Sequence, residues 1–171
     1  MFRKYFCFVF FALLFRAVVF GETLAIACFQ NEDADEKCKN VTAAFEDFLF
    51  EPFFESGFIV TSLPLSEIKE QTEIKAEDLK NLFEELTGYI LICRMSYGKD
   101  LVFNKKLDKK IPDWKTLKVS LINFSSGKEI YSKLFDMNKI KEAEPIKKGE
   151  ELSVIIALEV IKAINKSKES N

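Results

Sequence analysis

The chain has 171 residues, of which 25 are Lys or Arg, 27 are Asp or Glu and none is His. Because histidine is absent, the sequence holds no Ser-His or Cys-His nucleophile pair, no imidazole general base and no His-ligated metal. A hydrophobic fraction of 48% excludes a disordered chain, and the length is typical of a single domain.

Residues 1–21 have the pattern of a cleaved signal peptide. Arg3 and Lys4 form a basic start, residues 5–15 are apolar, and a segment suited to signal peptidase follows. Arg16 interrupts the apolar run, which is short for a membrane-spanning helix. We therefore expect an exported protein that is periplasmic or anchored on the periplasmic side of a membrane. An uncleaved anchor and a buried apolar helix are the alternatives.

Residues 24–28 allow a lipoprotein variant of this interpretation, with Cys28 as the lipidated cysteine. Glu22 and Thr23 separate this segment from the apolar run, and residues 23–29 also alternate like a first strand. Removal of residues 1–21 takes away three positive charges and no negative ones, which leaves 22 basic and 27 acidic residues and a net charge of −5. Such a mildly acidic chain lacks the excess of positive charge that is typical of nucleic-acid-binding proteins.

Three cysteines remain once Cys7 leaves with the signal peptide. One disulfide with one free or lipidated thiol is the simplest arrangement for an oxidising compartment. A Cys28–Cys38 bond closes a short polar loop, whereas a Cys28–Cys93 bond requires two neighbouring strands side by side. Three buried, reduced cysteines acting as small apolar side chains are the alternative.

The first half of the mature chain alternates between strand and helix patterns. Residues 23–29 are a short apolar run and predict a buried strand. Asn40 is a suitable N-cap for a helix over 41–55, and Pro52 is expected to bend or end that helix in its last turn. Residues 58–63 are β-branched and predict a second strand.

A second helix is expected at residues 74–86, with Gly88 as its C-terminal glycine. The nearly continuous apolar run at 89–97 then predicts a central buried strand. Residues 98–113 are expected to form a lysine-rich loop with a short extended piece at 101–103.

Residues 114–124 and 129–135 both alternate and are joined by a turn, which predicts a hairpin. After a polar linker, a helix is expected from Glu150 to residue 164, followed by a polar tail over 166–171. That helix is apolar on most of its circumference. It is therefore expected to be either deeply covered by the sheet or partly covered by another subunit, as in a homo-oligomer.

The expected order of elements is β-α-β-α-β-β-β-α. Early alternation of strands and helices favours parallel strands, and the later hairpin adds an antiparallel edge. We therefore predict a single α/β domain over residues 22–165, with three helices and a four- to five-stranded mixed sheet.

Several phrases of this sequence resemble a family of small bacterial envelope domains. These phrases are TLAIACF at 23–29, GFIV at 57–60, TGYIL at 87–91 and VSLINFSSGKEI at 119–130. The family includes the TolB amino-terminal domain, the curli secretion channel protein and the lipoproteins that activate penicillin-binding proteins. The resemblance implies an exported, non-catalytic interaction or assembly domain with a protein partner in the envelope, and it supplies no catalytic residues.

Motifs for chemistry are missing from the sequence. The six glycines are isolated, so there is no phosphate-binding or dinucleotide-binding loop. Residues 31–36 open like a calcium loop, but Glu36 and Thr42 stand where that loop requires Gly and Glu. We expect no catalytic residue, no cofactor and no metal. The alternative is a secreted small-ligand-binding protein, or an enzyme that uses carboxylates or a cysteine.

Lysine is concentrated between residues 99 and 118, where seven lysines face three aspartates. Lys105, Lys106, Lys109 and Lys110 are the candidate contact for an anionic partner or a membrane surface. The alternative is a solvated loop whose lysines protect the edge of the sheet from pairing with another chain.

Overall fold

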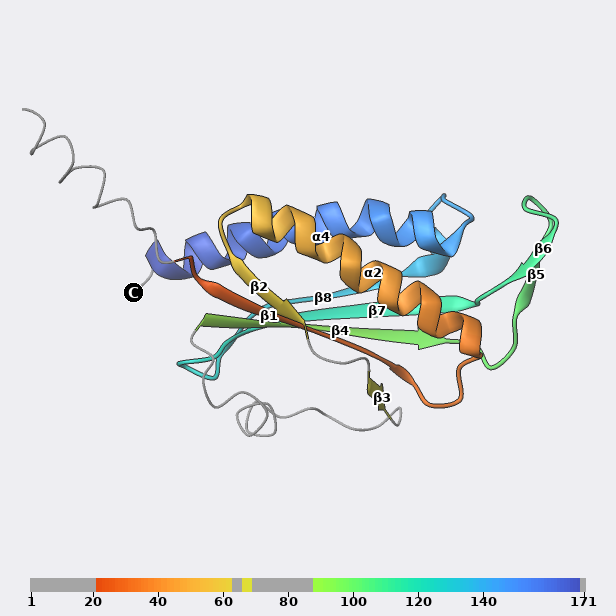
Figure 1. Ribbon diagram of the computed structural model, residues 1–171, viewed down its shortest axis with the longest axis horizontal. Coiled ribbons are helices and arrows are strands. Elements are labelled where there is room, and N and C mark those ends of the chain that lie inside the picture. The colour runs from red at the N-terminus through yellow and green to blue at the C-terminus, as the bar shows by residue number, and fades with distance from the viewer. Residues whose placement is uncertain (1–20, 63–65, 69–87, 170–171) are drawn as a thin grey trace, which may run out of the picture.

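The computed structural model describes residues 21–62, 66–68 and 88–169 (Figure 1). Residues 1–20 of the expected signal peptide and the helix expected at 74–86 lie outside the described residues. Within the described part of the chain, the elements are β1 (Thr23–Asn31), α2 (Glu36–Glu55), β2 (Ile59–Ser62), β3 (Ser66–Ile68), β4 (Gly88–Tyr97), β5 (Val102–Asn104), β6 (Lys109–Ile111), β7 (Trp114–Asn123), β8 (Glu129–Asp136), the short 3₁₀ helix η2 (Met137–Lys139) and α4 (Pro145–Glu169).

The main sheet has the strand order β2-β1-β4-β7-β8, and β3 also pairs with β1. Strand β1 runs parallel to β2, β3 and β4, whereas β7 runs antiparallel to both β4 and β8. The predicted α/β class, with parallel strands first and an antiparallel hairpin at the end, is confirmed. The sheet contains one more strand than expected, because β3 forms between residues 63 and 74, where no strand was predicted.

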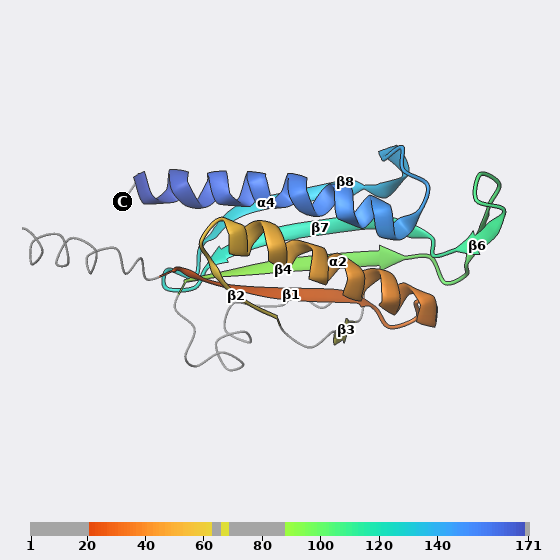
Figure 2. The ribbon, with the colours of Figure 1, turned by 45° about the horizontal axis from the view of Figure 1, so that its top comes forward.

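Helices α2 and α4 lie side by side on one face of the sheet (Figure 1, Figure 2). Phe45 of α2 packs edge-on against Trp114 of β7, with ring centroids 5.8 Å apart. The opposite face of the sheet is also buried, as shown by a cluster of apolar side chains at Ala25, Ala27, Phe29, Ile90, Ile92 and Ile122. Burial of both faces explains why β1 and β4 are apolar almost without interruption.

Helix α2 begins earlier than predicted. Its N-cap is Asp35, whose side chain accepts a hydrogen bond from the backbone N–H of Lys37 at 2.9 Å, so the prediction that Asn40 caps the helix is wrong. Pro52 lies inside the last turn and the helix ends three residues later at Glu55. The expectation that Pro52 would bend or end this helix in its last turn is confirmed.

Helix α4 is longer than predicted at both ends. It begins at Pro145, because proline suits the first helical position, where no intrahelical N–H donor is needed. The carboxylate of Glu142 accepts hydrogen bonds from the N–H groups of Ala143 and Glu144, at 2.6 and 2.8 Å, just before the helix. At the other end, residues 166–169 continue the helix that was expected to stop before a polar tail. There Lys168 forms an ion pair with Glu22 at 2.7 Å.

Candidate interaction surfaces

Helix α4 buries one face and leaves another uncovered. Its buried side packs against α2 and the sheet through Leu152, Ser153, Ile156, Ala157, Val160 and Ile164. On the opposite side three apolar residues remain open to solvent: Val154 is 50%, Ile155 46% and Leu158 67% exposed. The predicted cover by the rest of the domain therefore applies to one side of this helix, and cover of the other side by another subunit stays a prediction.

Exposed Glu151 and Lys162 stand at the two ends of this apolar stretch. The spacing of the five residues Glu151, Val154, Ile155, Leu158 and Lys162 brings them onto one side of the helix. We call these five residues the outer α4 face. Large contiguous apolar patches on the surface of a monomer mark sites of contact with another molecule.

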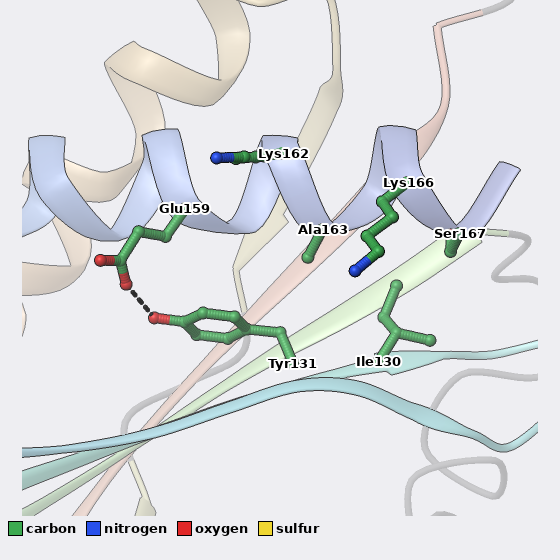
Figure 3. Close-up of a pocket in the computed structure, with 7 residues that line it drawn as sticks. All are labelled: Ile130, Tyr131, Glu159, Lys162, Ala163, Lys166 and Ser167. Carbon is green, nitrogen blue, oxygen red and sulfur yellow. Dashed lines mark hydrogen bonds between the residues drawn. The ribbon is translucent and has the colours of Figure 1, made fainter. Parts of the chain in front are cut away.

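A groove of about 570 Å³ runs between α4 and β8, next to the outer α4 face (Figure 3). Its lining is mainly apolar and consists of Ile130, Tyr131, Glu159, Lys162, Ala163, Lys166 and Ser167. The Tyr131 hydroxyl donates to Glu159 Oε2 at 2.5 Å, and Lys133 Nζ donates to both oxygens of the same carboxylate at 2.6 and 2.9 Å. The sequence carries no local signal for this contact, because Glu159 lies 28 residues from Tyr131 and 26 from Lys133, on a different element.

These contacts determine the charge state of the groove. Burial, together with the hydrogen bond to Glu159, raises the pKa of Tyr131, so its hydroxyl stays protonated and remains a donor. Partial burial opposes ionisation of Glu159, but the hydrogen bonds from Lys133 and Tyr131 outweigh it and lower the pKa of that carboxyl. The carboxylate is therefore fully engaged by a cation and a phenol, which is unsuited to a general base.

The four candidate lysines lie on a small hairpin of their own. Lys105 and Lys106 occupy the turn between β5 and β6, whereas Lys109 and Lys110 belong to β6, and all four are exposed. The hairpin projects from the end of the domain (Figure 2). The extended piece expected at 101–103 corresponds to β5, whereas β6 was missed because its residues read as polar loop. The lysines are solvent-exposed, as the alternative expects, but β5 and β6 form a two-stranded sheet of their own, so Lys109 and Lys110 do not lie on an edge of the main sheet.

Two exposed apolar residues accompany the lysines of the hairpin. Phe103 is 59% exposed and Val102 is 39% exposed. Lys109 also forms an ion pair with Glu144, at 3.6 Å, close to the start of α4. The hairpin therefore presents both positive charge and apolar surface to the solvent.

All three cysteines of the described residues are buried, free thiols, so neither candidate disulfide is formed in the structure. Cys28 lies in the middle of β1 with no exposed surface. A lipidated cysteine is the first residue of its mature chain, and lipidation at Cys28 would remove the first half of β1.

Two further features bear on function. Among residues 21–62, 66–68 and 88–169, no group of three or more His, Cys, Asp or Glu side chains is arranged to hold a metal ion. In that same part of the chain, no helix is long and apolar enough to cross a membrane.

A protein-family model described as "Uncharacterised protein" matches residues 23–165. The chain belongs to this family. The match starts at the first residue of β1 and reaches into the last turns of α4. No curated protein sequence matches the chain.

Several solved structures are similar to this chain. A PelC dodecamer from Paraburkholderia phytofirmans is 11% identical, with 80% of this chain and 84% of that chain covered and a TM-score of 0.46. TolB from Acinetobacter baumannii is 14% identical, with 81% and 28% covered and a TM-score of 0.44. Lipoprotein GNA1162 from Neisseria meningitidis is 14% identical, with 85% and 99% covered and a TM-score of 0.44. The expected resemblance to TolB is confirmed, and identities and TM-scores this low carry no information on activity or partners.

Proposed function

We propose that this chain is an exported, non-catalytic interaction domain of the cell envelope that forms a homo-oligomer through the outer α4 face. The observation that carries the proposal is the uncovered apolar stretch of Val154, Ile155 and Leu158 on a helix whose other side is buried. Association of two such stretches would remove these side chains from water, which is the main driving force for protein association.

The charges that flank this stretch favour a second copy of the same chain as its occupant. Ile155 and Leu158 lie symmetrically about one point of α4, and Glu151 and Lys162 lie symmetrically about that same point. In an antiparallel pair of α4 helices, Ile155 would therefore meet Leu158 of the partner subunit, and Glu151 would meet Lys162 of the partner subunit. A two-fold interface needs this self-complementarity.

Sedimentation of the mature chain over a wide range of concentrations tests this proposal. We expect a concentration-dependent oligomer, which Leu158→Lys converts to a monomer. The matched control is Leu134→Lys, because Leu134 on β8 is 66% exposed and lies away from α4. Glu151→Lys should weaken association, and adding Lys162→Glu should restore it. A strict monomer, or an oligomer that only Leu134→Lys disrupts, would contradict the proposal.

A second contact, between the β5–β6 hairpin and an anionic membrane surface, is supported by the composition of the hairpin. The lysine side chain carries a point charge on a flexible stem. Here the lysines are spread over both the turn and strand β6. Phe103 beside them offers an apolar side chain for the interfacial region of a bilayer. This combination suits a diffuse anionic surface better than a fixed set of carboxylates on a protein.

Co-sedimentation with vesicles tests the hairpin. We expect binding to vesicles that contain phosphatidylglycerol and none to pure phosphatidylcholine. Replacing Lys105, Lys106, Lys109 and Lys110 by Glu should abolish binding, and Phe103→Ser should weaken it without changing its salt dependence. Lys139→Glu, at an exposed position of η2, is the control. Equal binding by the four-lysine variant would contradict the proposal, as would capture of an acidic protein partner in place of lipid.

The absence of catalysis and the export step are part of the same proposal. Fully buried Cys28 and Cys93, and a Glu159 carboxylate held by Lys133 and Tyr131, support a domain without a free nucleophile or base. A thiol-reactivity assay on the folded protein is expected to show no fast-reacting cysteine.

Mass spectrometry of the protein recovered after export should find Glu22 at its N-terminus, and a retained residue 1 would contradict export by cleavage.

A further inference from the structure

Cys28 and Cys93 are direct neighbours in the sheet. They are register partners on the adjacent parallel strands β1 and β4, and both side chains belong to the core cluster beneath α2 and α4. Neighbouring strands lie about 4.8 Å apart, which is within the range of Cα separations that a disulfide accepts. The side-by-side strands that a Cys28–Cys93 bond requires are therefore present.

The surroundings of Cys38 are different. Cys38 lies in the first turn of α2, where the charged groups that act on its thiol are Asp35 and Asp113. The thiol of Cys28 instead lies close to that of Cys93 and to the carboxylate of Glu46 on α2, since both groups act on its pKa. Of the two possible partners of Cys28, Cys93 is the one that is its register partner and whose thiol acts on the pKa of Cys28.

The folded, reduced pair is protected from oxidation. Neither Cys28 nor Cys93 has exposed surface, so an oxidant has no direct access to either sulfur. In addition, the hydrogen bond between the thiols, burial and the nearby Glu46 carboxylate all raise the pKa of Cys28. The thiolate is the reactive form of cysteine, and it is strongly disfavoured here.

We propose that Cys28 and Cys93 form an intramolecular disulfide while the exported chain folds, before α2 closes over the sheet. This rests on the proposed export, because it needs a disulfide-bonded oxidant of the thiol–disulfide oxidoreductase or oxidised-glutathione class. The Cys28 thiolate, after losing its proton to solvent, attacks the oxidant and forms a mixed disulfide with release of one thiol. Cys93 then loses its proton and attacks the Cys28 sulfur, which forms the protein disulfide and releases the second thiol. Two protein thiols are oxidised by two electrons, and the oxidant disulfide is reduced to two thiols.

Refolding of the denatured, reduced mature chain with oxidised glutathione tests the pairing. Thiol titration in denaturant should fall from three thiols per chain to one. After trypsin without reductant, the peptide 22–37 should be linked to the peptide 81–94, since these carry Cys28 and Cys93. Linkage of 22–37 to the dipeptide 38–39 would overturn the proposal in favour of Cys38, and three free thiols would overturn it altogether.

Variants and a folded-state control complete the test. The Cys38→Ser variant should keep the linkage, and its Tm should still rise on oxidation. The Cys93→Ala variant should show neither the linkage nor the rise in Tm. Protein that is first folded in reductant should keep its three thiols in the same oxidant, and rapid loss there would overturn the proposed order of events. If the refolded chain forms the bond but protein isolated from cells stays reduced, the pairing stands and the proposed export fails.

Discussion

Asn31 and Tyr97 are joined by two hydrogen bonds, although 66 residues separate them in the chain. The backbone N–H of Tyr97 donates to Asn31 Oδ1 at 2.8 Å, and Asn31 Nδ2 donates to the Tyr97 carbonyl at 3.1 Å. The backbone pairing of β1 with β4 ends one step earlier, at Gln30 and Met95. The Asn31 side chain therefore satisfies the backbone of Tyr97 where the strand ladder stops.

Replacement of Asn31 tests this arrangement. Asn31→Ala leaves the N–H and the carbonyl of Tyr97 unpaired in a buried environment, and each unsatisfied group costs about 1–3 kcal/mol. We expect the free energy of unfolding in urea to fall by at least about 1 kcal/mol. Asn138→Ala, at an exposed position of η2, should change it by less than about 0.5 kcal/mol. Equal unfolding midpoints for the two variants would contradict a structural role for Asn31.

Gly88 occupies a position that no other residue fits. Its φ is +131°, and an added Cβ would collide with the backbone oxygen of Thr23 on β1. Gly88→Ala is therefore expected to destabilise the protein by more than about 2 kcal/mol, through backbone strain and loss of the β1–β4 pairing. Gly57→Ala is the matched control, because Gly57 also has positive φ (+88°) but nothing within 4 Å of the added atom. Gly57→Ala should lower the free energy of unfolding by about 1 kcal/mol. A similar loss of stability in both variants would exclude the collision with Thr23.

Gly149 should behave in the opposite way. It lies inside α4, and an added Cβ would be 3.5 Å from Phe45 Cδ2 and 3.8 Å from Trp114 Cζ3, which are ordinary contact distances. Gly149→Ala is expected to raise stability by about 0.5–1 kcal/mol, because alanine loses less backbone entropy in a helix. Thermal unfolding should show a higher Tm, whereas a lower Tm would mean that the interface between Phe45 and the helix has no room for a methyl group.

Periodicity predicted the strands better than the helix starts. The apolar alternation of β7 and the continuous apolar run of β4 reflect burial on one or both faces, which a sequence records directly. The first turn of α2 contains three charged residues, Glu36, Lys37 and Lys39, beside the buried Cys38, so its apolar character is weak. Asp35 and Asn40 are both suitable N-cap residue types, and the side-chain bond of Asp35 shows which of them caps the helix. The segment before Glu150 is polar and therefore favours a linker, although its Pro145 is equally suited to the first position of a helix.

The candidate surfaces depend on long-range packing and were therefore less predictable. The exposed side of α4 is as apolar as its buried side, as Val154, Ile155 and Leu158 show. Only the positions of α2 and β8 determine which side stays open. Likewise, parallel strands were predicted, but the neighbour relation of Cys28 and Cys93 follows from β4 lying next to β1. No local pattern encodes which strand is the neighbour.

The contact between α4 and β8 at Glu159 predicts a pH dependence of stability. Partial burial opposes ionisation of Glu159, but the hydrogen bonds from Lys133 and Tyr131 leave the pKa of this carboxyl in the folded state below its ordinary value of 4.5. The contribution to stability is therefore fully present above about pH 4.5 and is lost as the pH falls through the folded pKa. The side chains of Lys133 and Glu159 are each about one-third exposed or more, so solvent screening limits the contribution of their ion pair to stability to about 0.5–1 kcal/mol.

Comparison of the wild type with Glu159→Gln isolates this contribution. At pH 7 the variant should be less stable by about 0.5–1 kcal/mol, because Lys133 loses its carboxylate partner. At pH 3 the difference should be smaller, because the contribution of the carboxylate is lost as the pH falls below 4.5 and through the folded-state pKa. Glu150→Gln, at an exposed carboxylate of the same helix, is the control and should follow the wild type at both pH values. A difference between wild type and Glu159→Gln that persists unchanged to pH 3 would mean that packing, and not charge, accounts for the effect of this residue.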